Sequence, residues 1–156
     1  MKILSIDPGN EFSGYCIIDS ETYKPLEFGK IENNELLEII KTRQYDNSAI
    51  EMIASYGMSV GKSVFDTCVW IGRFIQALNV PYKYIYRRDE KMEICGSMRA
   101  KDTNIRHALI DRFAKHDFNS GKGTKANPDW FYGFKADVWS AYAIAVTYID
   151  REKRGE

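Results

Sequence analysis

The sequence predicts an α/β protein built around a mixed β-sheet. Three short apolar segments separated by turns open the chain, strand and helix patterns then alternate, and helices follow the last strand. Strands joined by tight turns form an antiparallel meander, whereas strands joined through helices pair in parallel. A sheet of this kind is expected to carry helices on both faces.

The β-strands are expected over residues 2–7, 13–19, 26–31, 48–53 and 82–86. The first three are bounded by Pro8-Gly9-Asn10 and by Lys24-Pro25, which are turn-forming sequences. The sheet should therefore have five strands.

Helical spacing of apolar residues predicts helices over 33–43, 62–78, 102–115 and 135–151, with a shorter helix near 89–95. Asn33 or Asn34 is suited to cap the first of these, and Pro81 follows the second. Residues 117–134 show no periodicity and are expected to be irregular.

Composition indicates one domain, covering residues 1–156. The chain is 44% hydrophobic, and no linker, repeat or low-complexity stretch divides it. Three cysteines without C-x-x-C spacing argue against a disulfide framework and indicate buried thiols in a reducing compartment. The apolar start of the chain is too short for a signal peptide or a membrane span, so we expect a soluble, cytoplasmic protein.

Charge is balanced overall but unevenly distributed. The chain has 22 basic and 22 acidic side chains, yet residues 83–125 hold 11 basic and 6 acidic ones, a net charge of +5. A locally basic segment suits contact with phosphates, although a solvated helix face explains the same run. Six cations surround two expected helix starts in this segment: Arg87, Arg88, Lys91, Arg99, Lys101 and Arg106.

Three acidic residues stand in apolar surroundings: Asp7 at the end of the first strand, Glu51 within the fourth, and Asp137 at the start of the last helix. A carboxylate in a partly desolvated site requires a compensating charge, and a divalent cation supplies one. Carboxylates holding two Mg²⁺ or Mn²⁺ ions are the usual apparatus of phosphodiester hydrolysis. Each residue also has an ordinary explanation: a turn former for Asp7, an ion pair for Glu51, and a first-turn helix acid for Asp137.

These motifs resemble those of the RuvC family of Holliday junction resolvases. The segment from Ile3 to Asn10, followed by Ser13-Gly14-Tyr15, is similar to the family's opening strand and turn. Ala49-Ile50-Glu51 is similar to its second acidic strand, and Lys135-Ala136-Asp137 to its final acidic helix. The resemblance implies a ribonuclease H-like fold with Asp7, Glu51 and Asp137 as catalytic and metal-binding residues. It also implies Mg²⁺, replaceable by Mn²⁺, a homodimer, and paired nicks across a four-way DNA junction.

One position departs from the family pattern. The resemblance implies a further aspartate one turn after Asp137, where this chain has Ser140. A hydroxyl is a weak ligand for Mg²⁺, so water or another carboxylate such as Asp129 would have to substitute. The departure is typical of a divergent, phage-type member, which would act in the host cytoplasm.

Three further segments have two interpretations each. The loop 54–61 presents Tyr56 and Met58 either to unpaired bases or to the core. The helix 62–78 has an apolar seam that serves either a two-fold mate or the sheet, formed by Val64, Cys68, Ile71, Ile75 and Leu78. The aromatic group at 130–134 similarly either stacks on bases or anchors the long loop.

The sequence thus predicts a Mg²⁺-dependent endonuclease that resolves Holliday junctions, with other branched DNA left open as a substrate. One alternative is a non-catalytic branched-DNA-binding protein of the same fold, as Ser140 hints. An actin-like ATPase also has an acidic turn after its first strand, but it requires a second phosphate loop and a glycine-rich adenosine site, and neither is present.

Overall fold

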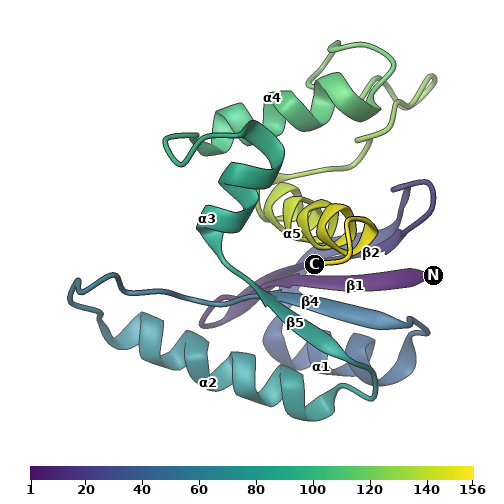
Figure 1. The fold of residues 1–156 in the computed structure, drawn as a ribbon. Coiled ribbons are helices and arrows are strands. Elements are labelled where there is room, and N and C mark those ends of the chain that lie inside the picture. The colour runs from purple at the N-terminus through teal and green to yellow at the C-terminus, as the bar shows by residue number, and fades with distance from the viewer.

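The computed structural model describes all residues, 1–156, as one mixed five-stranded sheet with helices on both faces (Figure 1). The strands are β1 (Lys2–Asp7), β2 (Phe12–Asp19), β3 (Pro25–Glu32), β4 (Asn47–Glu51) and β5 (Tyr82–Ile85). Their order in the sheet is β3-β2-β1-β4-β5. β1 to β3 pair antiparallel, whereas β4 and β5 continue the sheet in parallel from β1, which confirms the predicted meander and crossovers.

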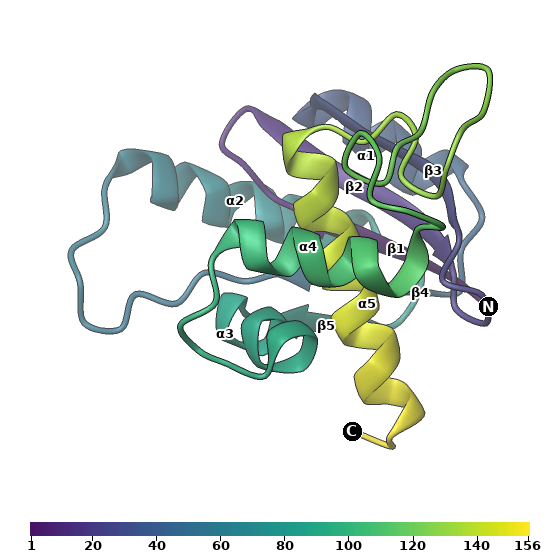
Figure 2. The ribbon, with the colours of Figure 1, turned by 90° about the horizontal axis from the view of Figure 1, so that it is seen from above.

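The helices divide between the two faces. α1 (Asn33–Thr42) and α2 (Lys62–Ala77) lie under the sheet in Figure 1, and α5 (Ala136–Lys153) crosses its other face, with α3 (Arg87–Glu90) and α4 (Asp102–Phe113) beyond it. Figure 2 shows α4 and α5 crossing one another over the sheet. None of the helices has the combination of length and apolar character needed to span a bilayer.

Strand alternation divides the core between these faces. Ile3 and Ala49 belong to the larger cluster beneath α5, whereas Leu4, Ile6 and Ile50 belong to the smaller cluster against α1 and α2. Because successive strand residues point to opposite faces, Asp7 lies on the same face as Ile3, and Glu51 on the same face as Ala49. Both carboxylates therefore belong to the face that α5 covers.

The helix after β5 differs from its expected limits. It begins at Arg87 rather than Asp89, because the Asp89 carboxylate accepts the Tyr86 backbone N–H at 2.9 Å and closes the first turn. The helix then widens into a π-helical turn, Lys91–Cys95, and ends at Gly96 with φ 69°. Glycine adopts this left-handed conformation without a steric penalty.

One smaller expectation is wrong, and two are confirmed only in part. Neither Asn33 nor Asn34 caps α1, whose N-cap is Glu32 without a side-chain bond, because the Asn33 side chain is drawn into the interior. The predicted seam of α2 is confirmed at Ile71 and in part at Ile75 and Leu78, which pack against the smaller cluster, but the other buried positions are Thr67 and Phe74. Of the cysteines, Cys16 alone is fully buried, and Cys68 and Cys95 are half-buried thiols.

Candidate active site

Asp7 and Glu51 end neighbouring parallel strands. Ile6 of β1 is in register with Ile50 of β4, so the next residues of the two strands are Asp7 and Glu51. Both lie at the carboxyl edge of the sheet and on the face covered by α5. The topology therefore places the two carboxylates side by side, although 43 residues separate them in the sequence.

The first turn of α5 lies directly over this pair. Gly14 of β2 is in register with Asp7, and a Cβ atom at Gly14 would stand only 2.5 Å from the backbone oxygen of Asp137. Farther along, the Ser5 hydroxyl donates a 2.6 Å hydrogen bond to the Ala141 carbonyl, which fixes the helix against β1. The absence of a side chain at Gly14 thus allows Asp137 to approach Asp7.

The turn after Asp7 is held by other side chains. Ser13 Oγ accepts the Gly9 backbone N–H at 3.0 Å and donates to Asn33 Oδ1 at 2.6 Å. Asn33 Nδ2 in turn donates to the Gly9 carbonyl at 2.9 Å. Because these bonds maintain the turn without the Asp7 carboxylate, the turn-former explanation does not account for that residue.

The electrostatics of Asp7 reflect crowding of negative charge. Burial, followed by the charges of Glu51 and Asp137, raises the pKa of Asp7 from 3.8 to about 7, while Arg87 and Lys30 act in the opposite direction. Lys30 also forms an ion pair with Asp137, with Nζ 2.5 Å from Oδ2. No three acidic, histidine or cysteine side chains are gathered closely enough to hold a metal as they stand. The compensating charges here are those of Lys30 and Arg87.

A fourth carboxylate, that of Glu90, joins this group from α3. Its side chain is fully buried, and burial together with the neighbouring Glu51 raises its pKa to about 10. Sequence reasoning missed Glu90, because an acid three residues after Arg87 has the spacing of an ordinary surface ion pair. Only the folded chain shows that this turn of α3 points inward.

Arg87 lies among these acids rather than on an open surface. Its Nη1 is 3.0 Å from Glu90 Oε1, and its Nη2 pairs with Asp102. Beside it, a cavity of about 130 Å³ is lined by Arg106, Asp137 and Ser140. Arg87 therefore balances part of the negative charge in the candidate site, a role that the basic run in the sequence did not indicate.

The other predicted cations do not form ion pairs with the protein's acids. Arg88, Lys91, Arg99 and Lys101 make no salt bridge, and all except the half-buried Lys91 are exposed. Arg106 lies with its guanidinium 5.4 Å from the Trp139 ring centre and its buried Nε atom without a hydrogen-bond partner. The protein's own carboxylates therefore do not neutralise these side chains.

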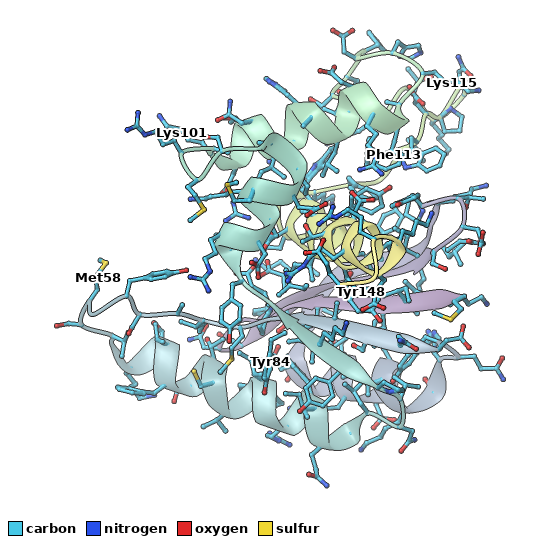
Figure 3. All side chains as sticks on the ribbon, viewed as in Figure 1. Met58, Tyr84, Lys101, Phe113, Lys115 and Tyr148 are labelled. Atoms are coloured by element: carbon cyan, nitrogen blue, oxygen red, sulfur yellow. The ribbon has the colours of Figure 1, made fainter.

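The loop after β4 extends into solvent. Tyr56 and Met58 are 64% and 74% exposed, so the interpretation that they pack against the core is wrong. Tyr56, with φ 49°, and Gly57, with φ 80°, turn the chain at the tip. In Figure 3, Met58 and Lys101 both project from the left side of the molecule.

Two other interpretations are resolved by packing. Asp129 is not available as a substitute ligand, because its carboxylate accepts the backbone N–H groups of Lys115, His116 and Trp130. In the aromatic segment, Phe131 and Phe134 are buried in the main core. This segment anchors the long loop, as the structural interpretation of its sequence predicted.

Together the sheet, helices and acidic edge define a ribonuclease H-like α/β fold. The structure is similar to that of RuvC from Thermus thermophilus, with a TM-score of 0.69 and 16% identity over 99% of this chain and 97% of that one. It is also similar to T. thermophilus RuvC in complex with a Holliday junction substrate, with a TM-score of 0.72 and 14% identity over 99% and 96% of the two chains. No family model and no curated protein matches the sequence. The predicted fold is confirmed.

Proposed function

We propose that this chain is a structure-selective endonuclease that resolves Holliday junctions by metal-dependent phosphodiester hydrolysis, giving paired nicks. The observation that carries the proposal is the meeting of Asp7, Glu51 and Asp137 from β1, β4 and α5 at one edge of the sheet. The similarity to a RuvC bound to a Holliday junction supports the substrate class. Other branched DNA, such as forks and flaps, is a further candidate substrate.

The chemistry of the site fits Mg²⁺, with Mn²⁺ as a substitute. All the donors are carboxylate oxygens, and burial together with the charges of Glu51 and Asp137 raises the pKa of Asp7 despite the nearby Arg87 and Lys30. Divalent ions, when bound, supply an activated water and stabilise the leaving oxygen. Asp7, Glu51 and Asp137 would hold them, and Lys30 would leave Asp137 for the negatively charged DNA backbone.

The substrate would lie across α3, the start of α4 and the loop after β4. We assign phosphate contacts to Arg88, Lys91, Arg99, Lys101 and Arg106, and base stacking at the junction to Tyr56. Because Arg87 lies among the carboxylates, the phosphate that it contacts would be the one next to the cleaved bond. The proposed metal-binding and DNA-contacting residues all belong to one sheet and the helices and loops around it, so we infer that residues 1–156 act as one nuclease domain.

Replacing Lys91 and Lys101 together by alanine should weaken junction binding about tenfold at moderate salt. Each removed phosphate contact also lowers the slope of log affinity against log salt, so the slope should fall by about 2. Fluorescence anisotropy over a salt series measures both quantities. The control is Lys41→Ala, an exposed lysine on α1 on the opposite face of the sheet; equal slopes in all three proteins would remove these lysines from the interface.

We further propose a homodimer that pairs through α2 and so sets two active sites against the two opposed strands. The inner face of α2 packs on the sheet, but Phe65 and Val69 remain 59% and 62% exposed on its outer side. Exposed large apolar side chains on one helix face suit a subunit contact. Phe65→Glu is expected to raise the dimer dissociation constant at least about tenfold, measured by sedimentation. The control is Lys24→Glu, an exposed lysine in the turn between β2 and β3, which should change it little.

Cleavage of labelled four-way junctions tests the proposal. The wild type is incubated with junction or linear duplex in Mg²⁺, Mn²⁺ or EDTA, and both strands are mapped. Symmetrical nicks in the junction alone, dependent on the metal, are expected. Tight binding without cleavage under any metal would instead establish the alternative, a branched-DNA-binding protein, which the missing carboxylate at Ser140 favours.

The same departure supports the view that this is a divergent member, of the phage type, acting in the cytoplasm of a host cell. Its 14–16% identity to T. thermophilus RuvC is consistent with that divergence. A phage-type origin would not alter the chemistry proposed for Asp7, Glu51 and Asp137.

A further inference from the structure

The Glu90 carboxylate is buried without enough partners. Its side chain has no exposed surface, and Oε1 accepts a 3.0 Å hydrogen bond from Arg87. The second oxygen, Oε2, is buried and has no hydrogen-bond donor. Buried carboxylate oxygens are normally satisfied, so an orphaned one requires a physical explanation.

The surroundings of Glu90 make its burial unfavourable for the stability of the fold. The neighbouring carboxylates of Glu51 and Asp7 both oppose ionisation of Glu90 and raise its pKa. Arg87 is shared with a further acid, Asp102. One guanidinium therefore serves several carboxylates, whereas an apolar side chain at position 90 would fill the same space without leaving a buried polar atom unsatisfied.

We propose that Glu90 is the fourth carboxylate of the divalent-cation site, with its unsatisfied Oε2 atom as the ligand. This inference rests on the proposed nuclease function. Glu90 reaches the site from α3, whereas Ser140 lies on α5 one turn after Asp137, in the cavity that Asp137 also lines. The chain thus supplies from α3 the carboxylate that position 140 lacks. Asp129, the other candidate, is occupied by backbone N–H groups.

Mn²⁺ binding to the DNA-free protein tests this assignment, using the electron paramagnetic resonance signal of free Mn²⁺. Glu90→Gln keeps the size of the side chain and can donate a hydrogen bond to Glu51, but it lacks the anionic oxygen. We expect Mn²⁺ affinity to fall at least about tenfold. The matched control is Glu93→Gln, three residues later, whose carboxylate pairs with Arg154 and should leave Mn²⁺ affinity unchanged.

Two further variants separate ligation from folding. Glu90→Leu removes the buried, incompletely hydrogen-bonded carboxyl group and fills its space, so the metal-free protein should melt at a higher temperature while Mn²⁺ affinity still falls. Adding Ser140→Asp to Glu90→Gln should restore affinity to within about threefold of the wild type. If Ser140→Asp does not restore Mn²⁺ affinity, the proposal that Glu90 takes the place of a carboxylate at position 140 is overturned.

The outcomes for the inference and for the nuclease proposal are distinct. If the wild type binds Mn²⁺ and cuts junctions, but Glu90→Gln and Glu90→Leu bind Mn²⁺ equally well, Glu90 is structural and the inference is overturned while the nuclease stands. If neither the wild type nor Asp7→Asn binds Mn²⁺, the nuclease proposal itself fails, and the inference fails with it.

Discussion

Asp7→Asn is expected to slow junction cleavage at least about 10³-fold while junction affinity stays within about twofold of the wild type. The substitution keeps the size of the side chain but removes the charge at the centre of the acidic group. A loss of this size corresponds to about 4 kcal/mol of transition-state stabilisation, which is typical when a metal-binding carboxylate is removed. Affinity should persist, because the proposed phosphate contacts lie on α3, α4 and the loop between them.

Single-turnover cleavage with excess enzyme measures the rate, and anisotropy in EDTA measures binding. The control is Asp111→Asn, an exposed acid on α4 that forms no salt bridge. Glu51→Gln should behave like Asp7→Asn, because both residues end neighbouring strands. If Asp7→Asn retained more than about a tenth of the wild-type rate, Asp7 would not be a metal-binding residue.

The succession of strands and helices along the chain was predictable because it depends on local patterns. Pro8-Gly9 and Lys24-Pro25 separate apolar runs that are too short for helices, and helix-forming segments separate the later strands. Strand ends were less predictable. β4 ends at Glu51 rather than Ile53, because its parallel partner β5 is in register with it only as far as Ile85.

The candidate site was predictable in part, for a different reason. Asp7, Glu51 and Asp137 stand out in the sequence as charges within apolar segments. Glu90 does not, because its neighbours Arg88, Asp89 and Lys91 are also charged. Its burial is created by the packing of α3 against α5, and no local pattern encodes that contact.

The metal-free protein is expected to lose stability as pH rises from about 4 to 7, and Asp7→Asn should remove that part of the loss. The pKa of Asp7 is 3.8 in the unfolded chain and about 7 in the fold, so over this interval the folded protein retains a proton that the unfolded chain has released. Stability falls with pH wherever the folded state binds more protons. A shift of this size is worth about 2 to 4 kcal/mol, allowing for partial exposure of Asp7.

Urea unfolding in EDTA, from pH 4 to pH 9, measures the difference between the two proteins. The advantage of Asp7→Asn should be absent near pH 4, grow up to pH 7 and stay constant above it, where the variant should melt roughly 5 to 15 °C higher. The pKa of Glu90, raised from 4.5 to about 10, predicts a further decline in both proteins that begins near pH 4.5 and continues at alkaline pH. Mg²⁺ should then stabilise the wild type by binding the folded state alone and leave Asp7→Asn nearly unchanged. If the stability advantage of Asp7→Asn over the wild type instead decreased with rising pH, Asp7 would be ionised and its charge compensated in the metal-free fold. A bound metal would then not act by relieving repulsion at Asp7.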